Sequence, residues 1–588
     1  MDRKPQKKNY RKLLYILLLA GSFFAALKCI FIGYQMDEGY AVAMSYRMLI
    51  GDKMISQIWD PHQTSAFFSA FLMWIYIALF HTAAGTAVWL RICGTLIHGM
   101  LSVGVYRAVR RFLPADHSFY LGILYFNLLP KGYVTPEFSN LLIWFLTLLL
   151  LDLSRLEDPD TGIFFSSSAR RIQFLHIPAR KKRGLIILRC GLWMCGMVLS
   201  YPSAAILFPF FLWYLWRQPE YGRKSALFFA GTCIACAGAY LAGLFSYMSP
   251  AQMLKNLNCM LIGNSGHTEV SLPSRLAAYG MQFGQALLIA ILCLFASWLF
   301  IKLRRTSDED KKEYPVLLMY LILMVAAVFP VIYWFFTPTN NDYFFIYTVY
   351  FILLAFAFYT VRELEEKNRK TISLWLVSSA FTFIAVLMLT DLTVFTSVRY
   401  ILPGVIMGLA SLLLYAEKHA PGVHRRYAAA LLFAFCFSSI FIKGWEYRGD
   451  QDVPQNITRV RGIISEGPAK GILAEYMQCA MHESLYAEMQ EYVSPGDNVF
   501  LLESDATGYL FQDVNIASYT TISDPRYNDI LLKYWELNPE KYPDVMIIPC
   551  WYGELHWDPE SWIVKWTEND FGATEIIDGT YFRYYIKK

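Results

Sequence analysis

The chain has 588 residues, of which 56% are hydrophobic and only 17% are charged, and its formal net charge is +5. The charged fraction lies well below the roughly 25% that is typical of soluble domains, so a wholly soluble protein is excluded. The mild positive charge gives no indication of nucleic-acid binding. Most of the cysteines lie inside apolar runs, where Cys behaves as a small hydrophobic residue.

The first element along the chain is a basic segment, residues 1–12, followed by an apolar run without a small-residue cleavage site. This pattern predicts a first helix that is retained in the mature protein. Apolar runs suited to crossing a bilayer then recur as far as residue 443. The sequence therefore predicts a mainly α, polytopic bundle of about thirteen transmembrane helices. The predicted spans are 13–33, 88–106, 118–134, 138–153, 184–200, 202–216, 225–246, 278–301, 315–336, 343–361, 372–390, 400–416 and 427–443.

Clusters of Lys and Arg between these runs predict the orientation, because basic loops stay on the cytoplasmic side of a membrane. One further apolar run, Ser65 to Phe80, would place the Arg107 cluster and the basic loop 170–183 outside if it crossed. We therefore predict that this run is a helix lying in the outer interface. With that assignment the N-terminus is cytoplasmic, and we expect a multi-pass protein of the cytoplasmic (plasma) membrane of a bacterium.

The same pattern divides the chain into two parts. Residues 1–443 are expected to form the membrane domain, whose longest outer loop, 35–87, is rich in aromatic residues and should hold interfacial helices. Residues 444–588 are expected to form a small extracytoplasmic α/β domain. There, 498–502 and 545–548 predict strands, 530–537 a helix, and 574–586 a hairpin. Cys479 and Cys550 could form a disulfide in this domain, although two free buried thiols explain them equally well.

Two adjacent carboxylates, Asp37 and Glu38, follow the outer end of the first predicted span. Ionisable groups at such a depth are costly and are often functional, although a solvated helix end would explain them too. These two residues are the catalytic candidates.

Several stretches share their order and sidedness with a known family. Met36-Asp37-Glu38-Gly39-Tyr40 follows the first span, Trp59-Asp60-Pro61-His62 lies in the long loop, and Leu90-Arg91 opens the second span. Thr135-Pro136-Glu137 precedes the fourth span, and Arg399-Tyr400-Ile401-Leu402-Pro403 opens the twelfth. Together these stretches resemble the GT-C glycosyltransferases, and within them the protein O-mannosyltransferase and lipid A aminoarabinose transferase group. The resemblance covers most of residues 10–445.

The resemblance implies a polyprenyl-phosphate sugar donor and an extracytoplasmic acceptor, which would be a glycan, lipid or protein hydroxyl. It implies that Asp37 is the general base or orients the acceptor, and that Arg91, Arg399 and Tyr400 lie near the lipid phosphate. Such a transfer needs a base for the acceptor proton and cations for the leaving phosphate. No cofactor is certain, and a divalent metal with unknown ligands stays open.

Two positions depart from the family pattern. The family often has His-Pro-Pro in the first loop, where this chain has Pro61-His62-Gln63, so His62 is a candidate substrate contact by position only. The acidic residue between the third and fourth spans is Glu137 in place of the usual Asp. His267, in a later outer loop, could contact substrate or a metal, although a polar loop would contain such residues anyway.

We therefore predict an integral membrane glycosyltransferase that transfers a hexose or pentose from a lipid-phosphate donor. A polyprenyl-linked glycan polymerase, ligase or flippase is the first alternative, and it would need charges along a pathway through the membrane. A non-catalytic membrane scaffold, whose soluble tail binds a partner, is the second.

Overall fold

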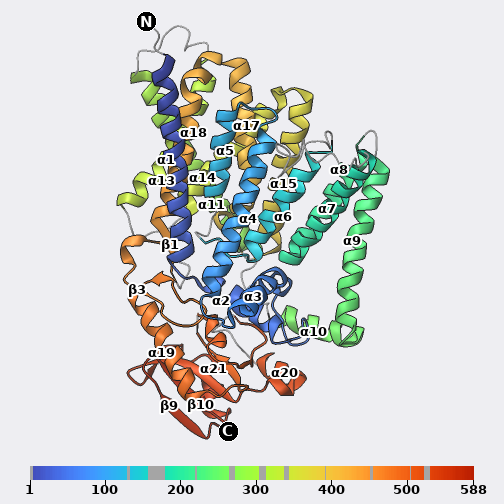
Figure 1. Ribbon diagram of the computed structural model, residues 1–588, viewed down its shortest axis with the longest axis vertical. Helices are drawn as coiled ribbons and strands as arrows, with labels where there is room; N and C mark the ends of the chain where they lie inside the picture. The colour runs from blue at the N-terminus through green and yellow to red at the C-terminus, as the bar shows by residue number, and fades with distance from the viewer. Residues whose placement is uncertain are drawn as a thin grey trace.

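The computed structural model describes residues 4–128, 133–156, 179–218, 222–263, 272–303, 313–336, 343–390, 392–449, 454–503, 505–521 and 530–587. A helical bundle forms one end of the molecule and a C-terminal region with a β-sheet forms the other (Figure 1). The N-terminus lies at the far end of the bundle, and the C-terminus lies in the sheet region. The predicted fold class, a mainly α polytopic bundle with a small α/β domain, is confirmed.

Long apolar helices build the bundle, as the sequence predicts. They are α1 (Lys4–Phe31), α4 (Thr86–Val109), α5 (Ala115–Asn127), α6 (Phe138–Leu153), α7 (Ala179–Ser200), η3 (Pro202–Leu207) with α8 (Phe208–Trp216), α9 (Gly222–Phe245), α11 (Leu272–Leu303), α13 (Tyr314–Phe336), α14 (Tyr343–Thr360), α15 (Glu366–Leu389), α17 (Leu402–His419) and α18 (Pro421–Trp445). Short elements join some of them: η5 (Val361–Glu363), α16 (Val394–Ser397) and η6 (Val398–Ile401).

The number of spans differs from the thirteen predicted. Ten helices of the described residues are long and apolar enough to cross a membrane, which makes the chain a multi-pass membrane protein. The predicted spans at 118–134, 138–153, 202–216 and 343–361 are not among them. Helices α5 and α6 have only 13 and 16 residues, and a straight crossing needs about 20. The run Ser65 to Phe80, which the sequence prediction left out of the spans, lies in one of these ten helices, Gln63–Phe80.

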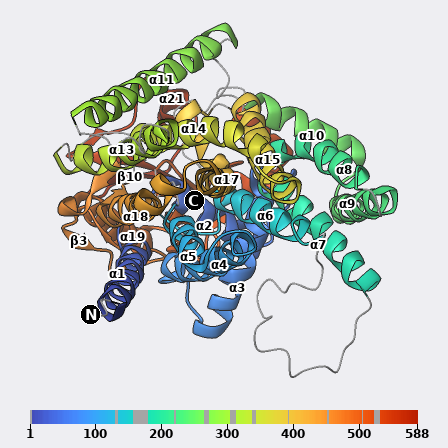
Figure 2. The ribbon, with the colours of Figure 1, turned by 90° about the horizontal axis from the view of Figure 1, so that it is seen from above.

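Helix α17 lies at the centre of the bundle, as the view from above shows (Figure 2). In the span Val394–His419 that contains it, 94% of the apolar window is buried inside the protein. Helices α9 and α11 lie at the periphery (Figure 2), where only 17% and 22% of their windows are buried. The start of α17 is therefore enclosed by protein on nearly all sides, which matters for Arg399 and Tyr400.

The long first loop folds into helices at the junction between the bundle and the C-terminal region. Helix α2 (Met36–Leu49) and helix α3 (Ala66–Phe80) lie there, with η1 (Gln63–Ser65) before α3 (Figure 1). Asp37 and Glu38 stand in the first turn of α2, where a negative charge interacts favourably with the positive end of the helix dipole. Helix α3 leaves large apolar side chains exposed, including Phe71, Trp74 and Phe80, as a helix against lipid would.

The C-terminal region contains a mixed sheet in the order β6-β5-β7-β10-β9. Strand β5 (Asn498–Leu501) is parallel to β6 (Asn515–Ile516) and β7 (Val545–Trp551), and β9 (Glu575–Asp578) with β10 (Phe582–Ile586) forms the predicted antiparallel hairpin. The remaining elements are α10 (Pro250–Gly263), β1 (Glu446–Arg448), β2 (Pro454–Asn456), η7 (Ile457–Arg459), β3 (Gly462–Ile463), β4 (Leu473–Ala474), α19 (Tyr476–Tyr492), η8 (Ala506–Leu510), α20 (Ile530–Leu537), η9 (Pro539–Lys541), β8 (Glu554–Leu555) and α21 (Trp562–Asn569). Cys479 and Cys550 are both free and buried, so the disulfide is not formed.

The first loop and the C-terminal region share one core. Buried side chains of α2, including Val42 and Tyr46, cluster with Ile464, Leu501 and Ile547 of the C-terminal region. The predicted boundary near residue 444 therefore separates two chain segments but does not separate two independent cores.

Buried charges tie the same two parts together. Asp52 accepts hydrogen bonds from Arg47 Nε at 2.7 Å and from Lys541 Nζ at 2.5 Å, and all three side chains are at most 7% exposed. Nearby, the Trp59 ring lies 5.6 Å from the ring of Tyr519 and 5.1 Å from that of Tyr534. The C-terminal region is thus fixed against the loop that carries the candidate site.

Candidate active site

A buried ion pair joins two of the predicted site residues. Arg91 Nε donates to Glu38 Oε1 at 2.7 Å and Nη2 donates to Oε2 at 2.5 Å, and both side chains are 1% exposed or less. The guanidinium also donates to the carbonyl oxygens of Ile30 at 3.0 Å and Gly33 at 2.5 Å. This two-pronged geometry is the one that arginine forms with carboxylates. Arg91 therefore fastens the start of α2 to the end of α1.

The third chain segment at this pair precedes α6. The Thr135 hydroxyl donates to Glu38 Oε1, and Val134 packs on α4 at Gly94, one turn after Arg91. A Cβ atom at Gly94 would lie 1.7 Å from the Val134 carbonyl oxygen, so only glycine allows this approach. Residues 133–137 are thereby held directly against the Glu38 carboxylate.

Glu137 caps helix α6. Its carboxylate accepts hydrogen bonds from the backbone N–H of Ser139 at 2.9 Å and of Asn140 at 2.8 Å, and the residue is 1% exposed. These bonds satisfy donors that the first turn of a helix otherwise leaves without partners. Tyr400 reaches the same turn, because its hydroxyl donates to Ser139 Oγ at 3.1 Å. Glu137 and Tyr400 are therefore brought together, although they lie far apart in sequence.

An aromatic cluster links His62 to Tyr400. The His62 ring stacks on Phe138 with 4.2 Å between centroids and a 6° interplanar angle, and it lies 4.6 Å from the Tyr201 ring. Tyr201 in turn lies 5.8 Å from Tyr400. On the other side of Phe138, the Tyr40 ring of α2 is 6.4 Å away. A continuous set of rings thus connects the α2 carboxylates to the start of α17.

The two remaining candidates border this cluster. Asp37 is half-buried and lies close enough to Tyr40 to act on its hydroxyl electrostatically. Arg399 is 4% exposed and its guanidinium lies 5.1 Å from the centre of the Tyr400 ring. The site therefore has a carboxylate at one end and a cation at the other, with aromatic side chains between them.

Asp60, five residues before the apolar run that begins at Ser65, is a titratable group in the resembling stretch Trp59-Asp60-Pro61-His62, and the sequence assigned it no role. It is 4% exposed, and its Oδ1 accepts a hydrogen bond from Thr520 Oγ1 at 2.8 Å. Burial raises the pKa of Asp60 to about 6, although the Thr520 hydrogen bond and the nearby Arg47 charge act in the opposite direction. Asp60 therefore titrates near neutral pH at the contact between the first loop and the C-terminal region.

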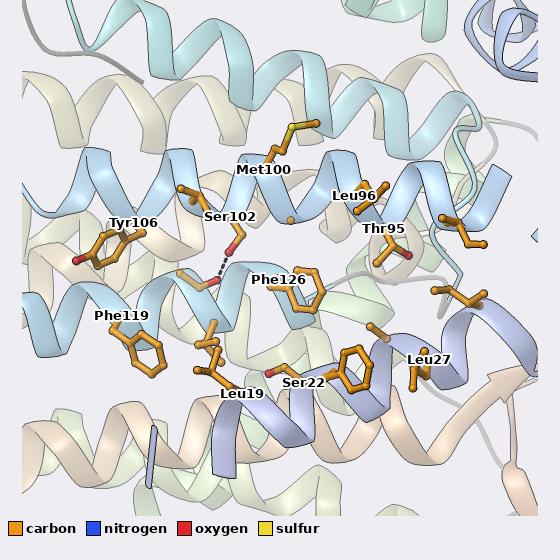
Figure 3. A pocket seen from close by; sticks show the side chains of 18 residues that line it. Leu19, Ser22, Leu27, Thr95, Leu96, Met100, Ser102, Tyr106, Phe119 and Phe126 are labelled. Carbon is orange, nitrogen blue, oxygen red and sulfur yellow. Dashed lines mark hydrogen bonds between the residues drawn. The ribbon is translucent and has the colours of Figure 1, made fainter. Parts of the chain in front are cut away.

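A groove opens beside His62. Its volume is about 600 Å³, and it is lined mainly by apolar residues of α7, η3, α8 and α9, with Pro61 and Gln63 from the loop. A second apolar cavity, of about 780 Å³, lies between α1, α4 and α5 (Figure 3). Hydroxyls on its wall, such as that of Ser102, are bonded to backbone carbonyls, so the cavity presents hydrocarbon (Figure 3). Only the first of the two adjoins the candidate site.

Two expectations lie beyond these contacts. His267 is outside the described residues, so its place is not given. Within the described ranges, no group of three or more His, Cys, Asp and Glu side chains is arranged to hold a metal ion.

Sequence reasoning missed part of the site. Thr135 and Asp60 lie inside the quoted stretches, but nothing in their spacing indicated contacts with Glu38 or the C-terminal region. Phe138 and Tyr201 had no distinguishing signal, because aromatic residues make up 17% of the chain. Only the folded arrangement separates them from the other aromatic residues.

Comparison with known proteins gives structural likenesses only. No family model and no curated protein matches the sequence. The chain is similar in structure to ArnT from Cupriavidus metallidurans bound to undecaprenyl phosphate, with 11% identity, a TM-score of 0.48, and 98% of this chain and 97% of that chain covered. It is also similar to the oligosaccharyltransferase AglB from Archaeoglobus fulgidus in complex with an inhibitory peptide and a dolichol-phosphate, with 11% identity, a TM-score of 0.42, and 92% and 69% covered.

The same archaeal enzyme in complex with Zn and sulfate gives 11% identity, a TM-score of 0.43, and 90% and 67% coverage. All three TM-scores are under 0.5, so no function is inferred from these likenesses, and the function proposed below is argued from this chain's own residues.

Proposed function

We propose that this protein is a membrane glycosyltransferase that moves a sugar from a polyprenyl-phosphate donor to an acceptor hydroxyl on the outer side of the membrane. The observation that carries the proposal is the cluster around Phe138. It joins His62, Tyr400 and the Asp37 helix at one end of an apolar bundle, beside an apolar groove. A lipid-linked donor needs this combination, because its tail belongs in hydrocarbon and its sugar belongs in water.

The groove of about 600 Å³ fits the tail of such a donor. Its wall is formed by helices long and apolar enough to cross a membrane, including α7 and α9. Pro61 and Gln63 flank His62 at its edge, so a phosphate at the end of a tail in this groove would lie near the aromatic cluster. We assign Arg399 to that phosphate, because arginine binds phosphate oxygens through a planar fork.

The reaction assigns one role to each group. The acceptor oxygen attacks the anomeric carbon of the donor, its proton passes to Asp37, and the bond between that carbon and the phosphate oxygen breaks. Polyprenyl phosphate leaves with the bonding electrons, and the Arg399 guanidinium stabilises the negative charge that develops on it. Glu38 does not take the proton in this scheme, because Arg91 holds it as a buried, ionised pair.

The other candidates shape the site. Glu137 and Tyr400 fix the first turn of α6, which positions Phe138 against His62. His62 is partly exposed and could contact the sugar, whereas Tyr400 is fully buried and supports the cluster from within the protein. The C-terminal region, with the sheet, lies on the acceptor side in this proposal and the basic loops lie in the cytoplasm.

The test is turnover of a panel of undecaprenyl-phosphate sugars by purified protein, with a membrane extract as the acceptor and release of undecaprenyl phosphate as the readout. Asp37→Asn keeps the shape and loses the base, so turnover should fall by about 10²- to 10⁴-fold. The matched control is Asp116→Asn, since Asp116 is an exposed partner of Arg11. Turnover of Asp37→Asn equal to that of the control, in folded protein, would remove Asp37 from the reaction.

A further inference from the structure

A buried histidine and aspartate of the C-terminal region lie beside the catalytic helix. His482, on α19, has its Nδ1 atom 2.6 Å from Asp505 Oδ2 and its Nε2 atom 3.2 Å from the Glu466 carbonyl oxygen. The side chains of His482 and Asp505 are 2% and 15% exposed. A carbonyl oxygen and an ionised carboxylate can only accept hydrogen bonds, so this arrangement suits an imidazole that donates from both ring nitrogens.

Asp505 is held by its own segment as well. Its Oδ1 accepts hydrogen bonds from the backbone N–H of Thr507 at 3.0 Å and from the Thr507 hydroxyl at 2.5 Å, which caps η8. Burial favours the neutral acid, but the bonds from His482 and Thr507 outweigh it and hold the pKa of Asp505 below its usual value. Asp505 is therefore an ionised carboxylate with a fixed position.

This carboxylate touches the first turn of α2. A Cβ atom added at Gly39 would lie 3.4 Å from Asp505 Oδ1 and 3.4 Å from the Tyr34 hydroxyl, which is van der Waals contact, so Asp505 packs directly beside the first turn of α2. Gly39 follows directly after Asp37 and Glu38. Asp505 therefore contacts the same helical turn that carries both carboxylates.

Charge is balanced at this turn by two cations. Arg91 pairs with Glu38, and His482 pairs with Asp505. The other ionisable groups around the pair are Glu38 on α2, Arg91 on α4, Tyr34 before α2, and Glu466 with its partner Lys470. Loss of the imidazolium would leave an additional negative charge next to the catalytic carboxylate.

We propose that the His482–Asp505 pair is a positioning element for α2, through which the C-terminal region takes part in turnover. The pair sets the place of the first turn of α2 by contact, and it keeps the local charge neutral when Asp37 has to accept a proton. This inference rests on the proposed function, because it takes Asp37 as the base. It differs from a division of labour in which the C-terminal region only selects the acceptor.

The first arm of the test measures turnover and binding of undecaprenyl phosphate with the full-length protein. Asp505→Ala should lower turnover by roughly 10- to 100-fold, the loss that a small misplacement of a catalytic group causes. Affinity for undecaprenyl phosphate should stay unchanged, and Asp505→Asn should restore most of the turnover. Asp578→Asn is the control, because Asp578 pairs with Arg583 in the β9–β10 hairpin.

The second arm is the dependence of turnover on pH, which a merely structural role would not move. The base works only when ionised, so activity rises with pH through its pKa. His482→Gln leaves Asp505 uncompensated and should move that rise to higher pH, by roughly half a pH unit for one added charge. Asp505→Asn removes a negative charge and should move the rise in activity to lower pH. The double variant, His482→Gln with Asp505→Asn, should return that rise to the wild-type pH.

The outcomes separate the two proposals. The positioning role would be overturned if Asp505→Ala had wild-type turnover, or if the pH dependence of His482→Gln and of Asp505→Asn shifted in the same direction, while Asp37→Asn stayed inactive. An active Asp37→Asn would overturn the proposed function instead. Asp505→Asn keeps an oxygen that can accept the hydrogen bonds of Thr507, so it should fold even if Asp505→Ala does not. The pH dependence of turnover in Asp505→Asn then decides the question.

Discussion

The buried pair of Arg91 and Glu38 predicts a specific pattern of mutational effects. Arg91→Ala leaves the fully buried Glu38 carboxylate without its cation, which typically costs about 3–5 kcal/mol of unfolding free energy. Arg91→Lys should also destabilise the protein, because one ammonium group cannot reproduce two bonds to Glu38 and two to the carbonyls of Ile30 and Gly33.

Removing both charges should behave differently. In Arg91→Met with Glu38→Gln no uncompensated charge is left, so most of the loss in stability should be recovered. A double-mutant cycle, measured by reversible unfolding in detergent, should give a coupling free energy of about 2 kcal/mol or more. Additive losses would contradict the pairing.

Binding of undecaprenyl phosphate then separates two roles for Arg91. If Arg91 acts by holding Glu38, the double variant should bind undecaprenyl phosphate nearly as well as the wild type. Arg399→Ala should instead lose affinity by about 10- to 100-fold, the value of a charge-assisted hydrogen bond. A double variant that is stable but does not bind undecaprenyl phosphate would refute this reasoning and place Arg91 at the phosphate.

Three further predictions follow from other contacts. Because the pKa of Asp60 is raised from 3.8 to about 6, ionisation of Asp60 destabilises the folded protein as pH rises through that range. The stabilisation of Asp60→Asn over the wild type should therefore grow by up to roughly 3 kcal/mol of unfolding free energy between pH 4 and pH 7. An identical pH dependence of unfolding in the variant and the wild type would contradict the shift. Gly94→Ala should lose both stability and turnover through its clash with the Val134 carbonyl. Gly99→Ala on the same helix, whose Cβ would only make van der Waals contact with Phe126 at 3.6 Å, should be neutral or slightly stabilising in thermal unfolding. For the proposed orientation, a cysteine at Arg111 should react with an impermeant thiol reagent only from the cytoplasmic side, and labelling from outside would reverse every loop assignment.

Much of the fold follows from local sequence patterns. Apolar runs and the turn residues around them predicted the bundle helices, and the C-terminal helix at Ile530–Leu537 was predicted with the observed bounds. Alternating and buried-strand patterns located β5, β7 and the β9–β10 hairpin. Ten of the helices in the described residues are long and apolar enough to cross a membrane, and Phe138–Leu153 and Pro202–Trp216 are shorter apolar helices at two further predicted spans.

The site was predicted less completely, and the reason is physical. Its place after the first predicted span indicated Asp37, and the family resemblance added His62 and Tyr400 as candidates. Sequence could not show which charges are neutralised inside the protein, because that depends on partners such as Arg91 that lie far away along the chain. The His482–Asp505 pair lies in a region with no recognised motif, and no local pattern relates it to α2.

The shared core between the first loop and the C-terminal region has a consequence for how the protein matures. Ribosomes deliver α2 and the loop that carries Trp59 early in synthesis, whereas Tyr519, Tyr534 and Lys541 emerge hundreds of residues later. Until those late residues arrive, Asp52 lacks Lys541 and one face of Trp59 is uncovered. An incomplete chain would therefore be inserted in the membrane with an unfinished outer loop, and the proposed activity would begin only after the residues up to Lys541 have folded.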